Sequence, residues 1–353
     1  MQLTSKPFGS IDAEPAQRFM LANDNGLSMA VLSYGGIIQQ INVPDRLGQC
    51  ENVALGYGSL SEYVPNNAYF GALVGRFANR IAHGRFELDG EVIQLTCNDG
   101  TNHLHGGNRS FSRRVWTVAP AESPGEVAID LSLHSSDGEE GYPGNLEVEV
   151  RYALTNDNEV RVKYRAHSDR KTIVNLSQHS YFNLRGEGSG TALDHHVQIN
   201  ASRFIPVDES LNPTGEIRLV AGTPFDFQES SPISRGIRSS YDQIRLGRGY
   251  DHSFVIDRPP ESEGVLIPSA TLFDPASHRS LSVKTTEPGL QLYTGNFLNG
   301  SDIGFSKRAY RQGDGIALES QHFPDSPNQP GFPSVVIEAG ETFTSETVYE
   351  FTW

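Results

Sequence analysis

The chain has 353 residues and a formal net charge of −15, with 37% hydrophobic and 20% charged residues. This composition is typical of a soluble globular protein and excludes an intrinsically disordered one. The acidic balance argues against nucleic acid and anionic membranes as partners, because both require clustered Lys or Arg.

The cysteine content and the N-terminal sequence indicate the cellular compartment in which the protein is expected to work. Cys50 and Cys97 are too few for a disulfide framework and are expected to be free thiols, although a single bridge between them stays open. Residues 1–7 lack the basic-then-apolar pattern of a signal peptide. No stretch approaches the roughly 18 continuous apolar residues of a transmembrane helix. These features predict a cytoplasmic protein.

Alternation of apolar and polar residues with a period of two dominates the chain and predicts β-strands. In chain order, the predicted strands fall at 28–32, 37–43, 86–95 (a hairpin with an Asp89-Gly90 turn), 129–133, 147–166 (a hairpin with its turn at 156–158), 197–200, 253–256, 282–285, 290–294 and 335–338.

Helical periodicity is weak, and only 59–66 and 233–240 are expected to form short helices. The 35 glycines and 20 prolines indicate many turns and long loops. We therefore expect an all-β protein, a single domain over residues 1–353 built as one large antiparallel β-sandwich. Such a fold leaves a concave sheet face or a loop end for a ligand.

Polar clusters lie between the predicted strands. Asn79 and Arg80 offer hydrogen-bonding groups for sugar hydroxyls, although an arginine salt-bridged at a strand end explains the pattern as well. His103 and His105 would share a side of an extended segment, as half of a metal site does. No acidic residue follows closely to complete that site, so no metal is predicted. His105 is expected to hydrogen-bond a substrate, or else to lie in a surface loop.

Two further clusters supply groups that can transfer protons. Glu319 follows an apolar run and precedes a loop rich in Pro, Asn and Ser, which can aim its carboxylate into a cleft. His179, among apolar and aromatic neighbours, is either an acid near neutral pH or a core histidine held by the backbone. Asp251 either accepts hydroxyl hydrogen bonds or is a turn residue, and Gln291 lies on a predicted strand that could face the same site.

Six motifs follow one another along the chain: Gly-Arg-Phe-Ala-Asn-Arg-Ile (75–81), Asn-His-Leu-His-Gly-Gly (102–107), Gln-His-Ser-Tyr-Phe-Asn-Leu (178–184), Tyr-Asp-His-Ser-Phe (250–254), Gly-Leu-Gln-Leu-Tyr-Thr-Gly-Asn (289–296) and Ala-Leu-Glu-Ser-Gln-His-Phe-Pro-Asp-Ser-Pro-Asn (317–328). As a set they resemble the aldose 1-epimerase family, also called galactose mutarotases. The resemblance extends from about Tyr34 to the C-terminus.

This resemblance implies a β-sandwich of the galactose-mutarotase type that interconverts the α and β anomers of galactose and glucose. Glu319 would be the general base at the C1 hydroxyl, His179 the general acid at the ring oxygen, and His105 a second histidine nearby. Ring opening, rotation about C1–C2 and closure would invert the anomer without a metal or other cofactor. The residues expected to bind the sugar are Asn79, Arg80, Tyr181, Asp251 and Gln291.

Two alternatives stay open. A hexose-6-phosphate 1-epimerase would need cationic residues at the rim of the pocket, for which Arg76, Arg109, Arg113 and Arg114 are available. A non-catalytic sugar-binding module on the same fold should lack the base or the acid, and both are present. The expected partner is a small-molecule aldose, bound by a monomer or a homodimer.

Overall fold

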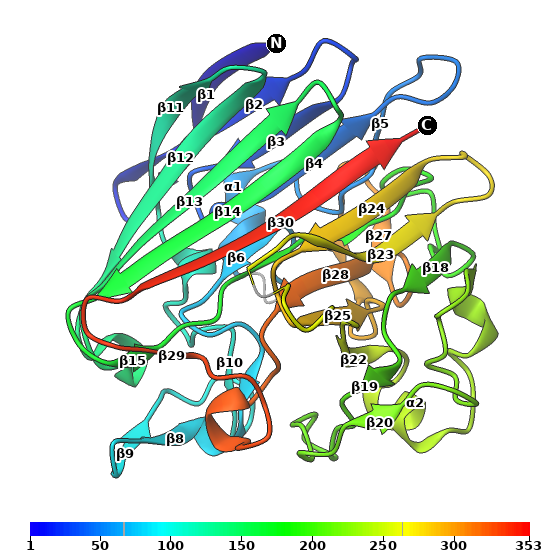
Figure 1. Cartoon of the computed structure of the whole chain (residues 1–353). Helices are drawn as coiled ribbons and strands as arrows, with labels where there is room; N and C mark the ends of the chain where they lie inside the picture. Colours follow the sequence, from blue (N-terminus) through cyan, green and yellow to red (C-terminus); the bar gives the residue numbers. More distant parts are fainter. Residues whose placement is uncertain (66–67, 263) are drawn as a thin grey trace.

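The structure, a computed structural model, describes residues 1–65, 68–262 and 264–353 (Figure 1). Its largest element is an antiparallel sheet of nine strands, seen face-on across Figure 1. From one edge to the other, the sheet consists of β11 (Thr117–Ser123), β12 (Glu126–Ser135), β13 (Leu146–Thr155), β14 (Glu159–Ser168), β30 (Thr342–Thr352), β24 (Ser280–Thr285), β23 (Ile267–Phe273), β18 (His196–Ile199) and β21 (Ser231–Pro232).

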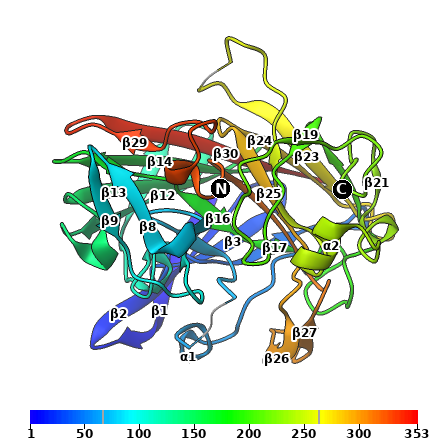
Figure 2. The ribbon, with the colours of Figure 1, turned by 90° about the horizontal axis from the view of Figure 1, so that it is seen from below.

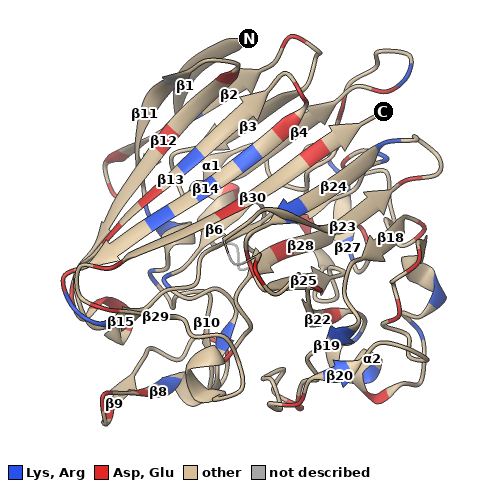
Figure 3. Cartoon of the chain, viewed as in Figure 1, with Lys and Arg blue, Asp and Glu red and all other residues tan. Residues whose placement is uncertain are grey.

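The period-two alternation explains how this sheet is oriented. Along β13, Val148 and Val150 are buried while Glu147 and Glu149 are exposed, so one face is apolar and the other is wet. Figure 3 shows acidic and basic residues interleaved along these strands. Neighbouring strands pair them, as in the contact of 2.7 Å between Arg151 Nε and Asp130 Oδ1.

Two smaller antiparallel sheets form the opposite layer (Figures 1 and 2). The five-stranded sheet contains β1 (Gln2–Ile11), β2 (Glu14–Ala22), β3 (Ser28–Leu32), β4 (Ile38–Val43) and β5 (Glu51–Asn52). The six-stranded sheet has the order β17 (Tyr181–Phe182), β28 (Ile316–Gln321), β25 (Gly289–Tyr293), β22 (Asp251–Val255), β19 (Arg203–Phe204) and β20 (Arg218–Leu219). One apolar cluster joins all three sheets, with Val150, Val31 and Leu318 among its members. The expected β-sandwich is confirmed.

The remaining strands form short two-stranded sheets beside the three large ones. They are β6 (Ala72–Val74) with β16 (Ser177–His179), β7 (Arg80–Ile81) with β10 (His103–Leu104), β8 (Arg85–Leu88) with β9 (Glu91–Gln94), β15 (Thr172–Ile173) with β29 (Val336–Ile337), and β26 (Asn299–Ile303) with β27 (Ala309–Arg311). Every strand predicted from the sequence overlaps a strand of the structure, and β8–β9 is the hairpin expected at 86–95.

The two expected helices differ from the structure. The first is α1 (Leu60–Tyr63), and residue 66, at the end of the expected helix, lies outside the described residues. The second was expected at 233–240, but there the chain forms only a 3-10 turn (Ile233–Arg235), and α2 follows at Asp242–Gly247. Gly236 ends the turn, and the Ser239 hydroxyl accepts the backbone N–H of Tyr241, a bond that competes with helix formation. No helix among the described residues could span a membrane.

Candidate active site

The alternation of side chains along β25 and β28 determines which of them point into the apolar core and which point away from it. Leu292 pairs with Leu318, and both are buried in the apolar cluster between the layers. Because neighbouring residues point to opposite faces of a strand, Glu319 and its partner Gln291 point away from that cluster. The far face of the six-stranded sheet is therefore polar.

A cavity of about 1000 Å³ opens on this face. Seven of the eight residues predicted for the site line it, brought together from five separate stretches of the chain: Asn79, Arg80, His105, His179, Tyr181, Asp251 and Glu319. Gln291 does not line the cavity. It lies behind Asp251, to whose Oδ1 its amide donates a hydrogen bond of 2.7 Å.

Glu319 and His179 face each other at the bottom of the cavity. The Nε2 atom of His179 lies 3.6 Å from Oε1 of Glu319. Oε2 of Glu319 and Nδ1 of His179 are buried and have no hydrogen-bond partner within the part of the chain that is described. The pair therefore has hydrogen-bonding capacity to offer to a ligand.

Burial pushes the pKa values of these two groups in opposite directions. It raises the pKa of Glu319 well above its usual value, with a further contribution from the negative charge of Asp251. Burial lowers the pKa of His179 to about 4. Loss of hydration disfavours the charged form of each group. Burial therefore favours the neutral form of both groups.

His105 is held by a reciprocal contact with Asn79. Its Nδ1 accepts the backbone N–H of Asn79 at 3.1 Å, and its own backbone N–H donates to the Asn79 carbonyl at 3.1 Å. Both residues have left-handed backbones, with φ of 66° at Asn79 and 50° at His105. Such conformations cost free energy and are concentrated at functional sites.

The contact with Asn79 fixes the tautomer of His105 and bears on metal binding. His105, His179 and Glu319 each offer one ligand atom, and these atoms lie within 4.8 Å of one another. A histidine that binds a metal normally donates its other ring N–H to an acceptor. Here the other nitrogen, Nδ1, is itself the acceptor, so neutral His105 carries its proton on Nε2. That tautomer suits a hydrogen-bond donor to a ligand oxygen better than it suits a metal ligand.

The second histidine of the His-x-His pair plays a structural part. Nδ1 of His103 contacts the Thr96 carbonyl at 2.6 Å, and Nε2 contacts the hydroxyl of Tyr142 at 2.6 Å. Both ring nitrogens are thus engaged away from the cavity. His195 is fully buried, and its Nε2 accepts the backbone N–H of Leu184.

A positive charge, that of Arg80, lies close to the carboxyl groups of the cavity. Arg80 Nε contacts Asp99 Oδ2 at 2.8 Å, and its positive charge lowers the pKa values of Asp251 and Glu319. In both carboxyl groups the effect of burial is larger, so the pKa of Asp251 is also raised overall. Asp251 and Arg80 thus offer acceptor and donor groups to the cavity, and Gln291 supports Asp251 from behind.

Aromatic rings enclose the proton-transfer groups. Tyr181 stacks on His179 with ring centroids 4.9 Å apart, and its hydroxyl donates to the Ala68 carbonyl. Tyr69 lies 4.7 Å from the ring of His105 and 6.0 Å from that of His179. Sequence reasoning missed Tyr69 and Tyr293, which also line the cavity. The signal for Tyr69 was only an aromatic residue beside a loop, which is common in any β-rich protein, whereas Tyr293 lies within the motif at 289–296.

The four arginines considered for a phosphate lie mostly elsewhere. Only Arg113 lines the cavity. Arg76 is fully buried and donates to the carbonyls of Ser135 and Ser136, so it cannot serve at the pocket rim. Arg114 pairs with Glu139, and Arg109 lines a separate cavity of about 10 Å³.

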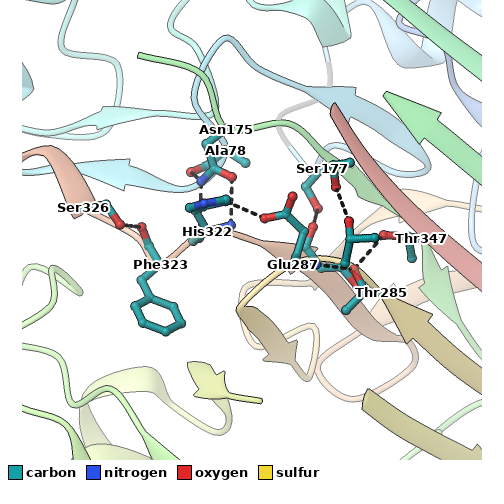
Figure 4. Close-up of polar contacts among 12 residues, drawn as sticks. Ala78, Asn175, Ser177, Thr285, Glu287, His322, Phe323, Ser326 and Thr347 are labelled. Carbon is teal, nitrogen blue, oxygen red and sulfur yellow. Dashed lines mark hydrogen bonds and ion pairs between the residues drawn. The ribbon is translucent and has the colours of Figure 1, made fainter. Parts of the chain in front are cut away.

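One buried amide ties the walls of the site together (Figure 4). The side chain of Asn175 donates to the Ala78 carbonyl at 3.2 Å and to the His322 carbonyl at 3.3 Å, and it accepts the His322 N–H at 3.0 Å. Ala78 precedes Asn79, and His322 follows the strand that carries Glu319. Asn175 therefore fixes the spacing between the loop of Asn79 and the end of β28.

Gly106 should tolerate no side chain, because the loop of His105 packs closely on its neighbour. A Cβ at Gly106 would lie 1.8 Å from the Gly75 carbonyl oxygen, and φ is +91°. We expect Gly106→Ala to lower the free energy of unfolding by at least about 2 kcal/mol, as measured by urea denaturation, and to reduce ligand binding.

Gly100→Ala is the matched control for this effect. Gly100 also has a positive φ, of +60°, but a Cβ there would meet nothing within 4 Å. Its cost should stay near the roughly 1–2 kcal/mol of a left-handed alanine. Equal losses in the two variants would contradict the steric explanation.

Comparison with known proteins agrees with this geometry. A family model described as aldose 1-epimerase matches residues 17–350. Galactose mutarotase from Sus scrofa is 42% identical over 353 residues, and aldose 1-epimerase from Escherichia coli strain K12 is 36% identical over 351 residues, each alignment covering 99% of both chains. The crystal structure of galactose 1-epimerase from Lactobacillus acidophilus has a TM-score of 0.88 and 33% identity, covering 99% of this chain and 98% of that one.

The match to the family thus spans almost the entire chain, and it coincides with the sandwich, the cavity and the facing carboxylate and imidazole. This chain belongs to the aldose 1-epimerase family.

Proposed function

We propose that this protein interconverts the α and β anomers of free aldohexoses, galactose and glucose, with Glu319 as the general base and His179 as the general acid. The observation that carries the proposal is the buried contact of 3.6 Å between His179 Nε2 and Glu319 Oε1 at the bottom of the cavity. A carboxylate and an imidazole this close can act on two neighbouring oxygens of one sugar, O1 and O5.

The proton balance follows from the roles of the two groups. Ring opening needs ionised Glu319 to take the proton of the C1 hydroxyl and protonated His179 to give a proton to the ring oxygen. The open-chain aldehyde then faces a neutral carboxylic acid and a neutral imidazole. Burial favours this neutral pair, because it raises the pKa of Glu319 and lowers that of His179. The protein environment thus favours the protonation state of the open-chain intermediate.

Closure of the ring reverses both transfers. After rotation about C1–C2, neutral His179 accepts the proton of the C5 hydroxyl and Glu319 returns its proton to O1. The N–H at Nε2 of His105, whose tautomer is set by Asn79, is available to stabilise negative charge on a sugar oxygen. We assign hydroxyl binding to Asn79, Arg80, Tyr181 and Asp251, and give Gln291 the role of orienting Asp251.

The charge of the cavity favours a neutral sugar over a sugar phosphate. Among the residues that the structure describes, two arginines and five carboxyl groups line it, namely Arg80, Arg113, Glu62, Asp99, Asp251, Asp302 and Glu319. A phosphate needs an excess of cationic donors. Competition by hexose 6-phosphate should therefore be weak.

The dependence of kcat/KM on pH should reflect a pair that works with one shared proton. As the pH falls through about 4, the pKa of His179, a second proton binds and no base is left. As the pH rises through the raised pKa of Glu319, the last proton is lost and no acid is left. We expect a bell-shaped profile with its acid limb near pH 4. A limb near 6.5, the ordinary value for histidine, would contradict the lowered pKa of His179.

Polarimetry tests the proposed activity directly. Freshly dissolved α-D-galactose or α-D-glucose should approach the same equilibrium rotation with and without the protein, but faster with it. A rate equal to the spontaneous rate for every free aldose tested would reject the proposal. Tight sugar binding without acceleration would instead favour a non-catalytic binding module.

Two expectations about the whole chain also belong to this proposal. We infer that residues 1–353 form one domain, since the main apolar cluster contains side chains from Phe19 to Phe351. We also infer that the protein works in the cytoplasm, where Cys50 and Cys97 would stay reduced. Both cysteines are exposed and free in the structure.

A further inference from the structure

The motif at 317–328, which begins on β28, contains another ionisable residue, His322, that the proposed reaction does not use. His322 lies three residues after Glu319, just beyond the end of β28. Its Nδ1 contacts Oε2 of Glu287 at 2.6 Å, and the Glu287 side chain is only 3% exposed (Figure 4). A buried carboxylate is costly to maintain unless it is paired and hydrogen-bonded.

Glu287 is itself firmly held. It lies between β24 and β25, its backbone N–H donates to the Thr285 hydroxyl, and its carbonyl accepts two hydrogen bonds from Arg258. Burial raises its pKa, but the neighbouring imidazole and hydrogen bonds outweigh that effect, so the pKa is lowered overall. The lowered pKa favours the ionised form of the Glu287 carboxyl group, and hydrogen bonds hold its backbone in place.

The strand register of the six-stranded sheet shows how Glu287 is placed relative to Glu319, the proposed base. Gly289 pairs with Gln321, and Gln291 pairs with Glu319, so Glu287 and His322 meet where this ladder ends. On its other side, the backbone of His322 is bound in both directions by the Asn175 side chain. The end of β28 is thus held by two networks, and the side chains of Glu287, His322 and Asn175 do not line the cavity.

We propose that the Glu287–His322 ion pair is a positioning device that fixes the end of β28 and thereby holds the Glu319 carboxylate at its distance from His179. The inference rests on the proposed function, because it assigns Glu319 the role of base. Glu287 and His322 touch no substrate. A misplacement of about 1 Å in a reacting group can reduce a rate by about 100-fold.

Kinetics of Glu287→Gln and His322→Gln test this role. Both substitutions keep the size of the side chain and remove the charge pair, and His322→Gln leaves the two backbone contacts with Asn175 in place. We expect each variant to lower kcat for galactose about 10- to 100-fold while the Kd of galactose, measured by calorimetry, changes less than about twofold. A full binding stoichiometry would show that the variant is folded.

Combination with Glu319→Gln identifies the group through which the pair acts. If it acts by placing Glu319, Glu287→Gln should cause no further loss in the Glu319→Gln background. Thr347→Val is the matched control, because Thr347 contacts Thr285 in the same network but not His322. It should lower thermal stability and leave kcat unchanged.

Three outcomes would overturn the proposal. The first is an unchanged kcat in Glu287→Gln and His322→Gln, and the second is an equal fold loss in the Glu319→Gln background. The third is a loss of kcat in Thr347→Val as large as that in Glu287→Gln, which would indicate general destabilisation. All three presuppose an active wild-type protein, so a failure here is distinct from failure of the proposed mutarotation, which wild-type polarimetry reports separately.

Discussion

Glu319→Gln should reduce kcat for the mutarotation of galactose by about 10²–10⁴-fold, close to the spontaneous rate. Glutamine has the size of glutamate, but its amide cannot take the proton of the C1 hydroxyl. The side chain is buried beside His179, so no other carboxylate replaces it at this position. Polarimetry with a correction for the uncatalysed reaction measures the loss.

Sugar binding should survive the same substitution, because the other residues that line the cavity are unchanged. The Kd of galactose is expected to stay within about tenfold of the wild-type value, since the amide can still hydrogen-bond O1. Glu149→Gln, an exposed residue on the outer face of β13, is the control and should retain full activity. Substantial turnover by Glu319→Gln would remove Glu319 as the base.

His179→Asn should cause the second large loss, again about 10²–10⁴-fold in kcat. Asparagine fills part of the space and can donate a hydrogen bond, but it cannot deliver a proton to the ring oxygen. Because acid and base act on one substrate in one step, the double variant with Glu319→Gln should be hardly slower than either single variant. Polarimetry on the three variants measures this lack of additivity.

His134→Asn is the control for loss of an imidazole. His134 is half-exposed on β12 and pairs with Glu147, far from the cavity lining in the sheet order. It should turn over galactose at the wild-type rate. If His179→Asn also did so, the acid would have to be another group, and His105 would be the first to examine.

The strands were predictable because the alternation of apolar and polar residues can be recognised within each segment. Alternation in β13 and β14 follows from which residues face the core, and nothing distant is needed to recognise it. The helix expected at 233–240 failed because Gly236 and Ser239 give the backbone other partners. Such choices depend on side-chain hydrogen bonds that a hydrophobic pattern does not report.

The sequence allowed the residues of the site to be predicted, but not the hydrogen bonds between them. The motifs pointed to Glu319 and His179, and the structure brings them to 3.6 Å. No local pattern reveals that Asn79 sets the tautomer of His105, or that Gln291 lies behind Asp251. These contacts join residues 26 and 40 positions apart, and they exist only once the sheets have assembled.

The separation between the charged outer sheet and the cavity has a practical consequence for handling the protein. The chain has five lysines, Lys6, Lys163, Lys171, Lys284 and Lys307. No lysine is among the described residues that line the cavity, and Lys163 and Lys284 lie on strands of the nine-stranded sheet, whose charged residues are coloured in Figure 3. Covalent attachment to a solid support through Lys163 and Lys284 should therefore leave the cavity open to sugar, so the immobilised protein can serve as a reusable catalyst.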